Sequence, residues 1–340
     1  VVNMGVIGSL IKQVWYINVP LTAISICVLA FLYSSRNVAF PYWVGLLVVP
    51  GVIYSLLGGR TYRTTIKGKT VLVTGASSGL GKQLAIECAR RGAAKVIVVA
   101  RRREKLQETA HQIQSLGSQS VVVPCDVSDA KAVEMAGKEI EEKHGTVHVL
   151  INNAGAGPWK HIEDTSAEEA RRMMAVPYQA AFTSTRVFAR RMMQEKNGHI
   201  MNVTSVVGYA GIPGAVGYGA ARWAMRGFTR HLRADLRELG IGVTLLTPAE
   251  ICDTEYFSNK SGCAGEKSYS HMPYIFHLCS TIFSITSKSA AVSGVNAMEY
   301  GWSIAAPPAW LVQPLLLLES YFPELIDWIG RLGGAACRKA

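Results

Sequence analysis

The chain has 340 residues, 49% of them hydrophobic, and a formal net charge of +11. This length holds one large domain or two ordinary ones, with enough sequence to bury a core. The basic residues crowd the end of an apolar segment and the end of one strand, which argues against nucleic acid as a partner and favours lipid headgroups or a cofactor phosphate, with a solvated surface as the alternative. The seven cysteines are scattered and never spaced as Cys-x-x-Cys, which predicts a reducing compartment and no metal site.

Two apolar runs without a charged residue lie near the start of the chain, at residues 14–33 and 38–58. Each holds about 20 residues, which is long enough to cross a bilayer core of about 30 Å. Because only four residues separate them, we expect a membrane-anchoring helical hairpin over residues 1–59. Helices that anchor the chain without spanning the bilayer are the alternative.

Basic residues follow the second run, namely Arg60, Arg63, Lys67 and Lys69. Since cationic residues next to a span stay on the cytoplasmic side, they predict that the rest of the chain faces the cytosol or an equivalent compartment. We expect the endoplasmic reticulum membrane, with a mitochondrial or other organelle membrane as the alternative.

From residue 60 to residue 301, apolar strand-like runs alternate with amphipathic helical patterns. The strands are expected at residues 71–74, 96–100, 120–124, 147–152, 199–204 and 242–246, and the helices at residues 82–91, 104–116, 130–143, 168–194 and 218–239. Continuous Val and Ile runs interleaved with helices are typical of a parallel sheet covered on both faces. We therefore predict an α/β fold in this domain, with a Rossmann-type doubly wound parallel sheet.

The first strand runs into a glycine-rich turn that opens a helix, with the sequence Thr74-Gly75-Ala76-Ser77-Ser78-Gly79-Leu80-Gly81. Gly75 allows the tight turn, Gly79 lets a pyrophosphate approach the backbone, and Gly81 allows the helix to pack closely on the strand. The amide dipoles of the helix then face the anion. In this context of strand, turn and helix, the motif predicts a dinucleotide site.

Two later strand ends carry side chains suited to the rest of a dinucleotide. Arg101 and Arg102 follow the second strand, where an enzyme that selects NAD places an acidic residue on the ribose. Because a guanidinium pairs with phosphate in a fork, these arginines predict NADP as the cofactor. Asp126 and Val127 follow the third strand, where a carboxylate can hold the adenine amino group; a helix N-terminal or turn role for Asp126 is the alternative.

Three further motifs follow: Asn152-Asn153-Ala154-Gly155 after the fourth strand, Ser205 after the fifth, and Tyr218 and Arg222 four residues apart on one helix face. Together with the glycine-rich turn, they resemble the short-chain dehydrogenase/reductase family over about the central two thirds of the chain. In that family a Ser orients the substrate carbonyl, a Tyr exchanges the proton, and a Lys favours the ionised Tyr and binds the nicotinamide ribose. The resemblance assigns these catalytic roles to Ser205, Tyr218 and Arg222.

The motifs and the resemblance together predict the residues that bind the cofactor. They are Thr74, Gly75, Ser77, Ser78, Gly79, Leu80, Gly81, Arg101, Arg102, Asp126, Val127, Asn153, Ala154, Gly155, Tyr218, Arg222, Pro248 and Thr254. Pro248 and Thr254 belong to a segment that resembles the Pro-Gly-x-x-x-Thr loop over the nicotinamide, with Ala249 at the position of its glycine.

Two positions depart from the family pattern. Arg222 stands in place of the Lys; it keeps a positive charge near Tyr218, but its guanidinium is larger and forked. Pro177 stands where the family has an Asn that anchors a water in the proton relay, and a proline removes an amide donor and bends the helix it enters. These changes are compatible with a rearranged relay, in which Arg222 or Tyr178 substitutes, or with lost chemistry.

The last part of the chain is apolar. Residues 255–286, where the family has its variable substrate lid, contain several aromatic residues and suit a hydrophobic substrate, with internal packing as the alternative. Residues 302–340 form an apolar C-terminal extension, which we expect at the membrane interface or packed on the domain. A dimer contact is the further alternative.

These observations predict a membrane-anchored, NADP-dependent oxidoreductase of lipid metabolism. It reduces an apolar ketone or aldehyde of a lipid, sterol or long-chain acyl type by hydride transfer, with Tyr218 as the proton donor. The expected partners are a hydrophobic small-molecule or lipid substrate and the membrane, with a homo-oligomer or a membrane complex as the assembly. The alternative is a non-catalytic or weakly active subunit of a membrane protein complex that retains bound NADP.

Overall fold

The computed structural model describes residues 61–155, 157–254 and 284–326. The predicted hairpin at residues 1–59 and most of the predicted lid at residues 255–286 lie outside these ranges. Within them, no helix combines the length and the apolar character needed to cross a membrane.

A seven-stranded parallel sheet forms the centre of the described domain, in the order β3-β2-β1-β4-β5-β6-β7. The strands are β1 (Thr70–Thr74), β2 (Lys95–Ala100), β3 (Gln119–Pro124), β4 (Val149–Asn152), β5 (Gly198–Val203), β6 (Ile241–Leu246) and β7 (Ile304–Ala305). β1 lies inside the sheet, with β2 and β3 added in turn on one side of it and β4 to β7 on the other. The direction in which strands are added therefore reverses between β1 and β4. The predicted Rossmann-type parallel sheet is confirmed.

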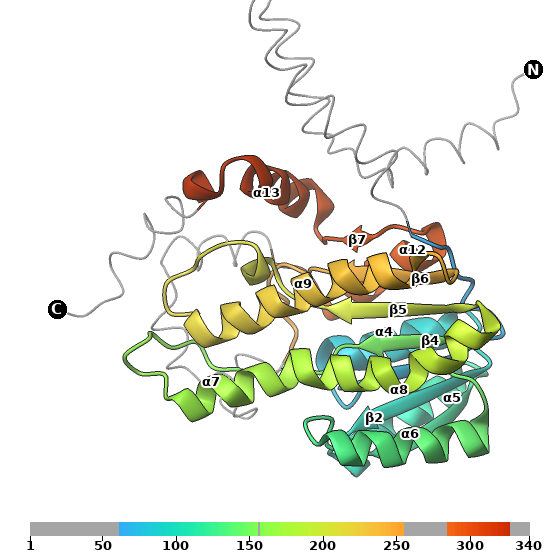
Figure 1. Cartoon of the computed structure of the whole chain (residues 1–340). Coiled ribbons are helices and arrows are strands. Elements are labelled where there is room, and N and C mark those ends of the chain that lie inside the picture. The colour runs from blue at the N-terminus through green and yellow to red at the C-terminus, as the bar shows by residue number, and fades with distance from the viewer. Residues whose placement is uncertain (1–60, 156, 255–283, 327–340) are drawn as a thin grey trace, which may run out of the picture.

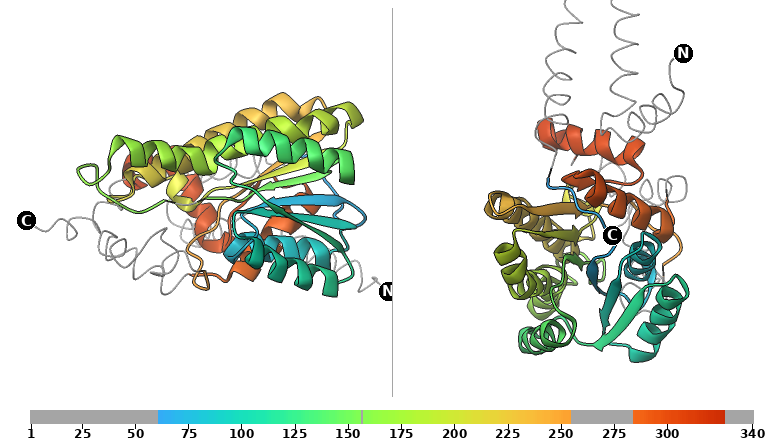
Figure 2. Two further views of the ribbon diagram at one scale, coloured as in Figure 1. Left: turned by 90° about the horizontal axis from the view of Figure 1, so that it is seen from below. Right: turned by 90° about the vertical axis from the view of Figure 1, so that its right-hand side faces the viewer.

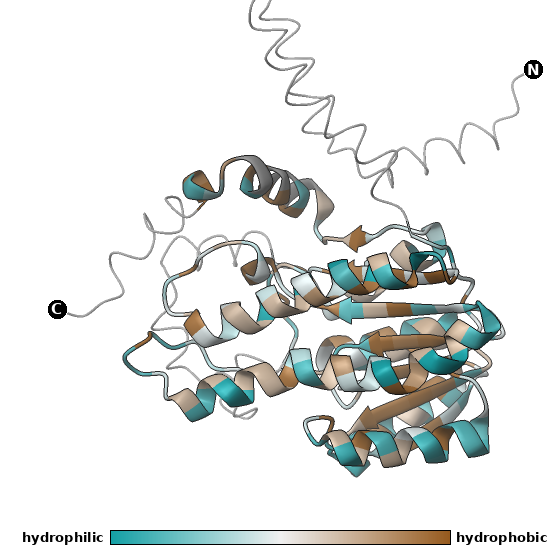
Figure 3. Ribbon diagram, in the orientation of Figure 1, coloured by the Kyte–Doolittle hydropathy of each residue, from teal (hydrophilic) through white to brown (hydrophobic). Residues whose placement is uncertain are grey.

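Helices cover both faces of this sheet, as Figures 1 and 2 show. One face carries α4 (Gly79–Arg90), α5 (Arg103–Ser115) and α12 (Ser287–Tyr300), and the other carries α6 (Ala130–His144), α8 (Ala180–Glu195) and α9 (Val216–Arg237). Each face has its own core, because Val71 and Val73 belong to the first and Leu72 between them belongs to the second. Figure 3 shows the mostly hydrophobic strands enclosed by helices in which hydrophilic and hydrophobic residues alternate.

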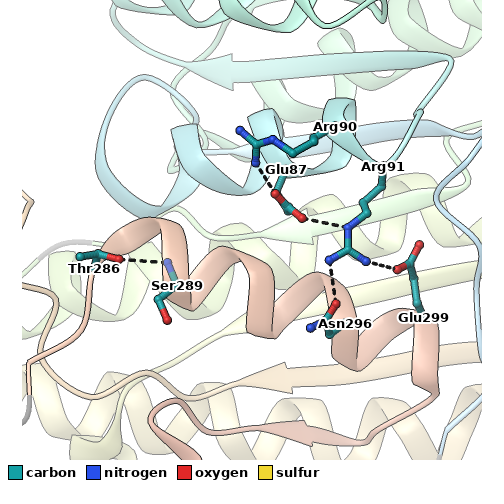
Figure 4. Close-up of polar contacts among 7 residues, drawn as sticks. All are labelled: Glu87, Arg90, Arg91, Thr286, Ser289, Asn296 and Glu299. Atoms are coloured by element: carbon teal, nitrogen blue, oxygen red, sulfur yellow. Dashed lines mark hydrogen bonds and ion pairs between the residues drawn. The ribbon is translucent and has the colours of Figure 1, made fainter. Parts of the chain in front are cut away.

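Polar contacts hold α12 against α4 (Figure 4). The buried carboxylate of Glu87 accepts hydrogen bonds from Arg90 and, at 2.9 Å, from Nε of Arg91. The same Arg91 reaches α12, where it donates to Glu299 at 2.6 Å and to Asn296 at 2.8 Å. This network fixes α12 on the helix that opens at the glycine-rich turn.

The sheet continues past residue 301, where the sequence pattern places the end of the domain. Ile304 of β7 pairs in parallel with Leu245 of β6. The first described residues pack nearby, since the amide of Thr61 donates to the carbonyl of Gly301 at 2.8 Å. The helix α13 (Ala309–Tyr321) follows β7 and lies along this edge of the domain (Figure 1).

The long helix predicted before β5 is interrupted at its middle. A π-helical turn at Ala175–Gln179 joins α7 (Ala167–Met174) to α8. Pro177 accounts for the break, because proline lacks an amide hydrogen and pushes the residue before it out of the helical region. Val176 accordingly has φ −135° and ψ 112°. The position where the family has its relay Asn is therefore a kink with a buried proline.

Candidate functional site

The predicted site residues meet at the carboxyl ends of the parallel strands. β1, β4, β5 and β6 all point the same way, so the turns that follow them lie at one edge of the sheet. The reversal of strand order between β1 and β4 lies at their centre. Ligands of open α/β sheets bind in the crevice at such a reversal.

The glycine-rich turn after β1 depends on its glycines. Gly75 and Gly79 have φ of 68° and 53°, in the left-handed region that glycine adopts without strain. At Gly81 a Cβ would lie 2.3 Å from both the carbonyl oxygen of Gly75 and Nδ2 of Asn153, so no side chain fits. Ser78 precedes α4 without capping its amides by a side-chain hydrogen bond, which suits an anion at this helix end.

Thr74 and Asn153 lock the turn after β4 to the end of β1. The hydroxyl of Thr74 accepts hydrogen bonds from the amides of Asn153 at 3.0 Å and Ala154 at 3.1 Å. In return, Nδ2 of Asn153 donates to the carbonyl oxygen of Thr74 at 3.0 Å. Leu80, at the start of α4, belongs to the buried core that α4 forms with the sheet. These contacts give Thr74 and Leu80 structural positions next to the turn.

Arg102 reaches back to the glycine-rich turn from the end of β2. Its Nη2 donates to the hydroxyl of Ser78 at 2.9 Å and to that of Ser77 at 3.1 Å. Arg101 and Arg102 are both exposed. The structure thus brings a guanidinium and two hydroxyls together at the place where the sequence predicts the 2′-phosphate.

Asp126, after β3, takes part in a local turn. Its Oδ1 accepts from the amide of Ser128 at 3.0 Å and from the Ser128 hydroxyl at 2.8 Å. Partial burial raises the pKa of this carboxyl, but the two hydrogen bonds and the charge of Arg101 outweigh it, so the pKa lies below its usual value. Asp126 therefore stays ionised beside Arg101, and Val127 packs against the core.

Tyr218 and Arg222 form the centre of the site on α9. The guanidinium carbon of Arg222 lies 4.7 Å from the centroid of the Tyr218 ring, and both residues are buried, at 6% and 7% exposure. Gly155 makes room for this arrangement, because a Cβ there would lie 2.8 Å from Nη2 of Arg222. Nε of Arg222 is buried and has no hydrogen-bond partner within the described ranges.

Ser205 follows β5 and caps a short 3-10 helix, Val206–Gly208. Its hydroxyl accepts from the amide of Val207 at 3.4 Å. The segment is tied to α9, since the hydroxyl of the preceding Thr204 donates to the carbonyl of Arg222 at 2.9 Å. Val207 also packs with Tyr218 in one apolar cluster. Ser205 thus stands on a segment in contact with the helix that carries Tyr218 and Arg222.

The segment after β6 borders both halves of the site. The carbonyl of Pro248 accepts from the amide of Val206, next to Ser205, at 3.3 Å. The methyl group of Thr254 would lie 3.3 Å from a Cβ at Gly79, so Thr254 faces the glycine-rich turn. The segment that contains Pro248 and Thr254 therefore contacts both the predicted catalytic residues and the predicted phosphate site.

Tyr178 does not replace the missing relay residue. Its ring packs edge-on against Phe228, with 5.8 Å between the centroids and an interplanar angle of 75°. Phe228 lies ten residues beyond Tyr218 along α9, a rise of about 15 Å. The structure therefore disfavours the predicted alternative in which Tyr178 takes over from the Asn.

A buried hydrogen-bonded chain behind the site escaped the sequence analysis. Nδ2 of Asn152 donates to Thr185 of α8 at 3.1 Å and to Asn202 of β5 at 2.9 Å. Asn202 in turn donates to Thr229 of α9 at 2.9 Å. These side chains fix β4, β5 and the two helices in one arrangement. The consecutive polar residues at strand ends were the available signal, but their pairing depends on the tertiary fold.

Trp159 is the other residue that the sequence analysis missed. Its ring stacks on that of Tyr218, with 5.8 Å between the centroids and 28° between the planes. It belongs to a buried apolar cluster around Tyr218, whose other members are Met173, Val207, Ile212 and Ala215. The side of Tyr218 occupied by this cluster is therefore apolar.

Comparisons with known proteins agree with this geometry. A family model described as short chain dehydrogenase matches residues 69–262. An uncharacterized oxidoreductase of Thermotoga maritima is 38% identical over 182 residues, which cover 54% of this chain and 71% of the relative. The bovine short-chain dehydrogenase/reductase 3 is 27% identical over 288 residues, which cover 84% of this chain and 89% of the relative.

A solved structure is similar over most of the described domain. An alcohol dehydrogenase of the archaeon Thermococcus sibiricus, complexed with 5-hydroxy-NADP, is 26% identical with a TM-score of 0.57. The match covers 68% of this chain and 90% of that one. The predicted resemblance to short-chain dehydrogenases/reductases is confirmed.

Proposed function

The chain belongs to the short chain dehydrogenase family of nicotinamide-dependent oxidoreductases, and from this premise we propose that it is an NADP-dependent reductase of an apolar ketone or aldehyde that works at a membrane. The residues at the carboxyl ends of the strands fit a dinucleotide. At Gly75, Gly79 and Gly81 the turn carries no side chain, which lets a pyrophosphate approach its backbone. The buried Nε of Arg222 is a donor without a partner among the described residues.

Each catalytic side chain has one role in the proposed reaction. The reduced nicotinamide, when bound, supplies the hydride that the carbonyl carbon accepts. The Ser205 hydroxyl holds the carbonyl oxygen by a hydrogen bond, and the Tyr218 hydroxyl donates its proton to that oxygen. The charge of Arg222 stabilises the tyrosinate that remains.

The contact between Arg222 and Tyr218 is the observation that carries this proposal. The guanidinium lies 4.7 Å from the ring centroid, and both side chains are buried. An interaction between charges is stronger in such a water-poor place than at the surface. A guanidinium also stays charged at every physiological pH. Arg222 therefore supplies the positive charge that the family obtains from lysine.

Arg102 supports NADP as the cofactor. Hydrogen bonds to Ser77 and Ser78 hold its guanidinium against the glycine-rich turn. A phosphate on the adenosine ribose would find there a planar cation and two hydroxyl donors, a set that suits phosphate better than a bare hydroxyl group.

Two observations support an apolar substrate and a membrane location. On one side Tyr218 packs against Trp159, Met173 and Ile212, which offer no charge to a polar substrate. The sequence before the domain contains two uncharged runs, at residues 14–33 and 38–58, each long enough to cross a bilayer. A lipid, sterol or long-chain acyl ketone fits both the apolar side of Tyr218 and a membrane location. The proposed location is the endoplasmic reticulum membrane, with the domain in the cytosol.

The experiment is NADPH oxidation by the full chain in detergent against a panel of long-chain ketones and aldehydes. Tyr218→Phe is the matched control, because it keeps the stacked ring and removes only the proton donor. We expect the variant to keep NADPH binding to within about tenfold, which corresponds to the loss of at most one neutral hydrogen bond, and to turn over about 10²-fold to 10⁴-fold more slowly. Equal turnover in both proteins would contradict the proposed role of Tyr218.

Pro177 favours a second candidate function, an NADP-binding subunit of a membrane complex without efficient turnover. This residue breaks the helix and has no side-chain group to hold a relay water. Tight NADPH binding by the native chain, without turnover of any substrate in the panel, would favour this candidate.

A further inference from the structure

The C-terminal helix α13 carries an exposed apolar stripe. Leu315, Leu318 and Phe322 are 42%, 39% and 45% exposed. They stand at positions i, i+3 and i+7, which share one side of a helix. Leu325, on a short helical segment that follows the C-cap Phe322 of α13, is 42% exposed as well. These four large apolar side chains, on α13 and just beyond its end, form a patch of the kind that marks an interaction surface.

The charge of α13 faces the protein and not the solvent. Glu319 is the single charged residue in the sequence of this helix, and it is only 8% exposed. Its carboxylate pairs with Arg226 of α9, at 3.2 Å and 3.3 Å. Arg226 also lies 3.8 Å from the centroid of the Tyr209 ring. α13 is therefore pinned to α9 by an ion pair and itself presents no charge to a partner, while the exposed acid Glu324 lies beyond its end.

α13 lies on the side of the domain where the chain enters from its apolar N-terminal sequence. The amide of Thr61, the first described residue, bonds to Gly301, eight residues before α13 begins. Figure 1 and the right panel of Figure 2 both show α13 and the first described residues on one side of the domain. A membrane that holds residues 14–33 and 38–58 would therefore lie against this side.

The surface beside the entry point has the composition of a membrane interface. Tyr62 and Tyr300 are 48% and 42% exposed, and Arg63 and Lys67, close to Tyr62 in the sequence, are exposed too. Exposed aromatic and cationic side chains of this kind settle at the headgroup level of a bilayer. A protein partner would not require this combination.

We propose that the stripe of Leu315, Leu318, Phe322 and Leu325 docks into the surface of a phospholipid bilayer. This inference extends the membrane part of the proposed function and does not depend on turnover. Docking would hold α9 close to the lipid, because Arg226 lies one helical turn beyond Arg222. An apolar substrate dissolved in the bilayer would then meet Tyr218 at a short distance from the membrane surface.

The test is site-specific photocrosslinking with the full chain reconstituted in vesicles of phosphatidylcholine and phosphatidylserine. Benzoylphenylalanine replaces Leu315, Leu318 or Phe322 in turn, all of which are exposed. Leu116 and Met135, 41% and 74% exposed, at the C-cap of α5 and on α6, provide the matched controls. Mass spectrometry of the irradiated protein identifies what each probe has captured.

We expect phospholipid adducts from the three stripe positions and none from the two controls. Adducts to a second copy of the chain, equal lipid labelling at the controls, or no adduct at the stripe would overturn the proposal. None of these outcomes depends on catalysis, so a chain without turnover still decides the question.

A second measurement uses the variant Leu315→Gln, Leu318→Gln, Phe322→Gln, which should fold normally because the three side chains are exposed. We expect its KM for a long-chain ketone carried in vesicles to rise on the order of tenfold. Its KM for a water-soluble short ketone should stay unchanged. An equal rise for both ketones would contradict docking as the cause.

Discussion

The guanidinium of Arg222 fits beside Tyr218 because residue 155 is a glycine. A Cβ at Gly155 would lie 2.8 Å, 3.0 Å and 3.2 Å from Nη2, Nη1 and Cζ of Arg222. We expect Gly155→Ala to displace the guanidinium and to slow single-turnover NADPH oxidation on the order of tenfold or more, since a misplacement of about 1 Å can slow a reaction about 10²-fold.

The control for this prediction is the same change in an Arg222→Lys background. The ammonium end of a lysine is smaller than a guanidinium. In the Arg222→Lys background, Gly155→Ala should therefore slow NADPH oxidation much less. An equal loss of single-turnover rate in the two backgrounds would show that Gly155 acts on something other than Arg222.

Arg102 should decide the choice between the two nicotinamide cofactors. We expect Arg102→Ala to raise the Kd for NADPH about tenfold to a hundredfold, which corresponds to the loss of a charge-assisted hydrogen bond. The Kd for NADH should change little, because NADH lacks the 2′-phosphate. Titration by nicotinamide fluorescence measures both constants. Arg103→Ala, at the neighbouring exposed position on α5, is the control; equal losses for both cofactors would refute the assignment.

His199 should make the folded state sensitive to acid. Burial within β5, helped by the charge of Arg233, lowers the pKa of this imidazole to about 3. The unfolded chain takes up a proton near the ordinary value of about 6.5. The neutral His199 therefore makes its full contribution to the free energy of unfolding above pH 6.5. This contribution is lost as the pH falls from 6.5 towards 3, at up to about 1.4 kcal/mol per pH unit.

Urea unfolding at several pH values measures this effect. The variant His199→Gln should show a flatter dependence of unfolding free energy on pH between 6.5 and 4 than the native chain. Parallel curves for the two proteins would assign the acid sensitivity to other groups.

At the scale of elements, the ion pair between α13 and α9 should decide whether the C-terminal helix stays in place. The side chains of Arg226 and Glu319 are 24% and 10% exposed, so the pair is screened only in part. We expect Glu319→Gln to leave the Arg226 charge without its partner and to speed amide hydrogen exchange in α13. Glu324→Gln, at an exposed acid beyond α13, is the control. Equal exchange in both variants would contradict the pinning role.

The helices and strands were largely predictable because each follows from local sequence. The Val and Ile runs of β1 and β2 pack on both sides and read as buried strands, and Pro177 predicts a bend in the helix where the structure has its π-helical turn. β7 was not predictable, because two residues, Ile304 and Ala305, are too short to show a period.

At the scale of the whole molecule, the site was predictable only as a set of strand ends. Parallel strands bring their carboxyl ends together, and the motifs at Gly75, Ser205 and Tyr218 each follow such an end or lie one segment beyond it. The stacking of Trp159 on Tyr218 and the pairing of Arg226 with Glu319 join residues distant in sequence. Such contacts depend on how the layers pack, which no local pattern records.

The central claim concerns the whole active site: Arg222 supplies the charge that lets Tyr218 donate its proton. The most direct test is single-turnover NADPH oxidation by the full chain, compared with Arg222→Lys and Arg222→Met. Both variants keep a long aliphatic side chain, and only Met removes the charge. NADPH binding is measured alongside, so that a loss of cofactor is not mistaken for a loss of proton transfer.

With cofactor and substrate saturating, we predict that Arg222→Lys retains turnover. Arg222→Met should oxidise NADPH about 10²-fold more slowly or slower still. Turnover of Arg222→Met at the native rate would contradict the account, because Tyr218 would then work without the neighbouring charge.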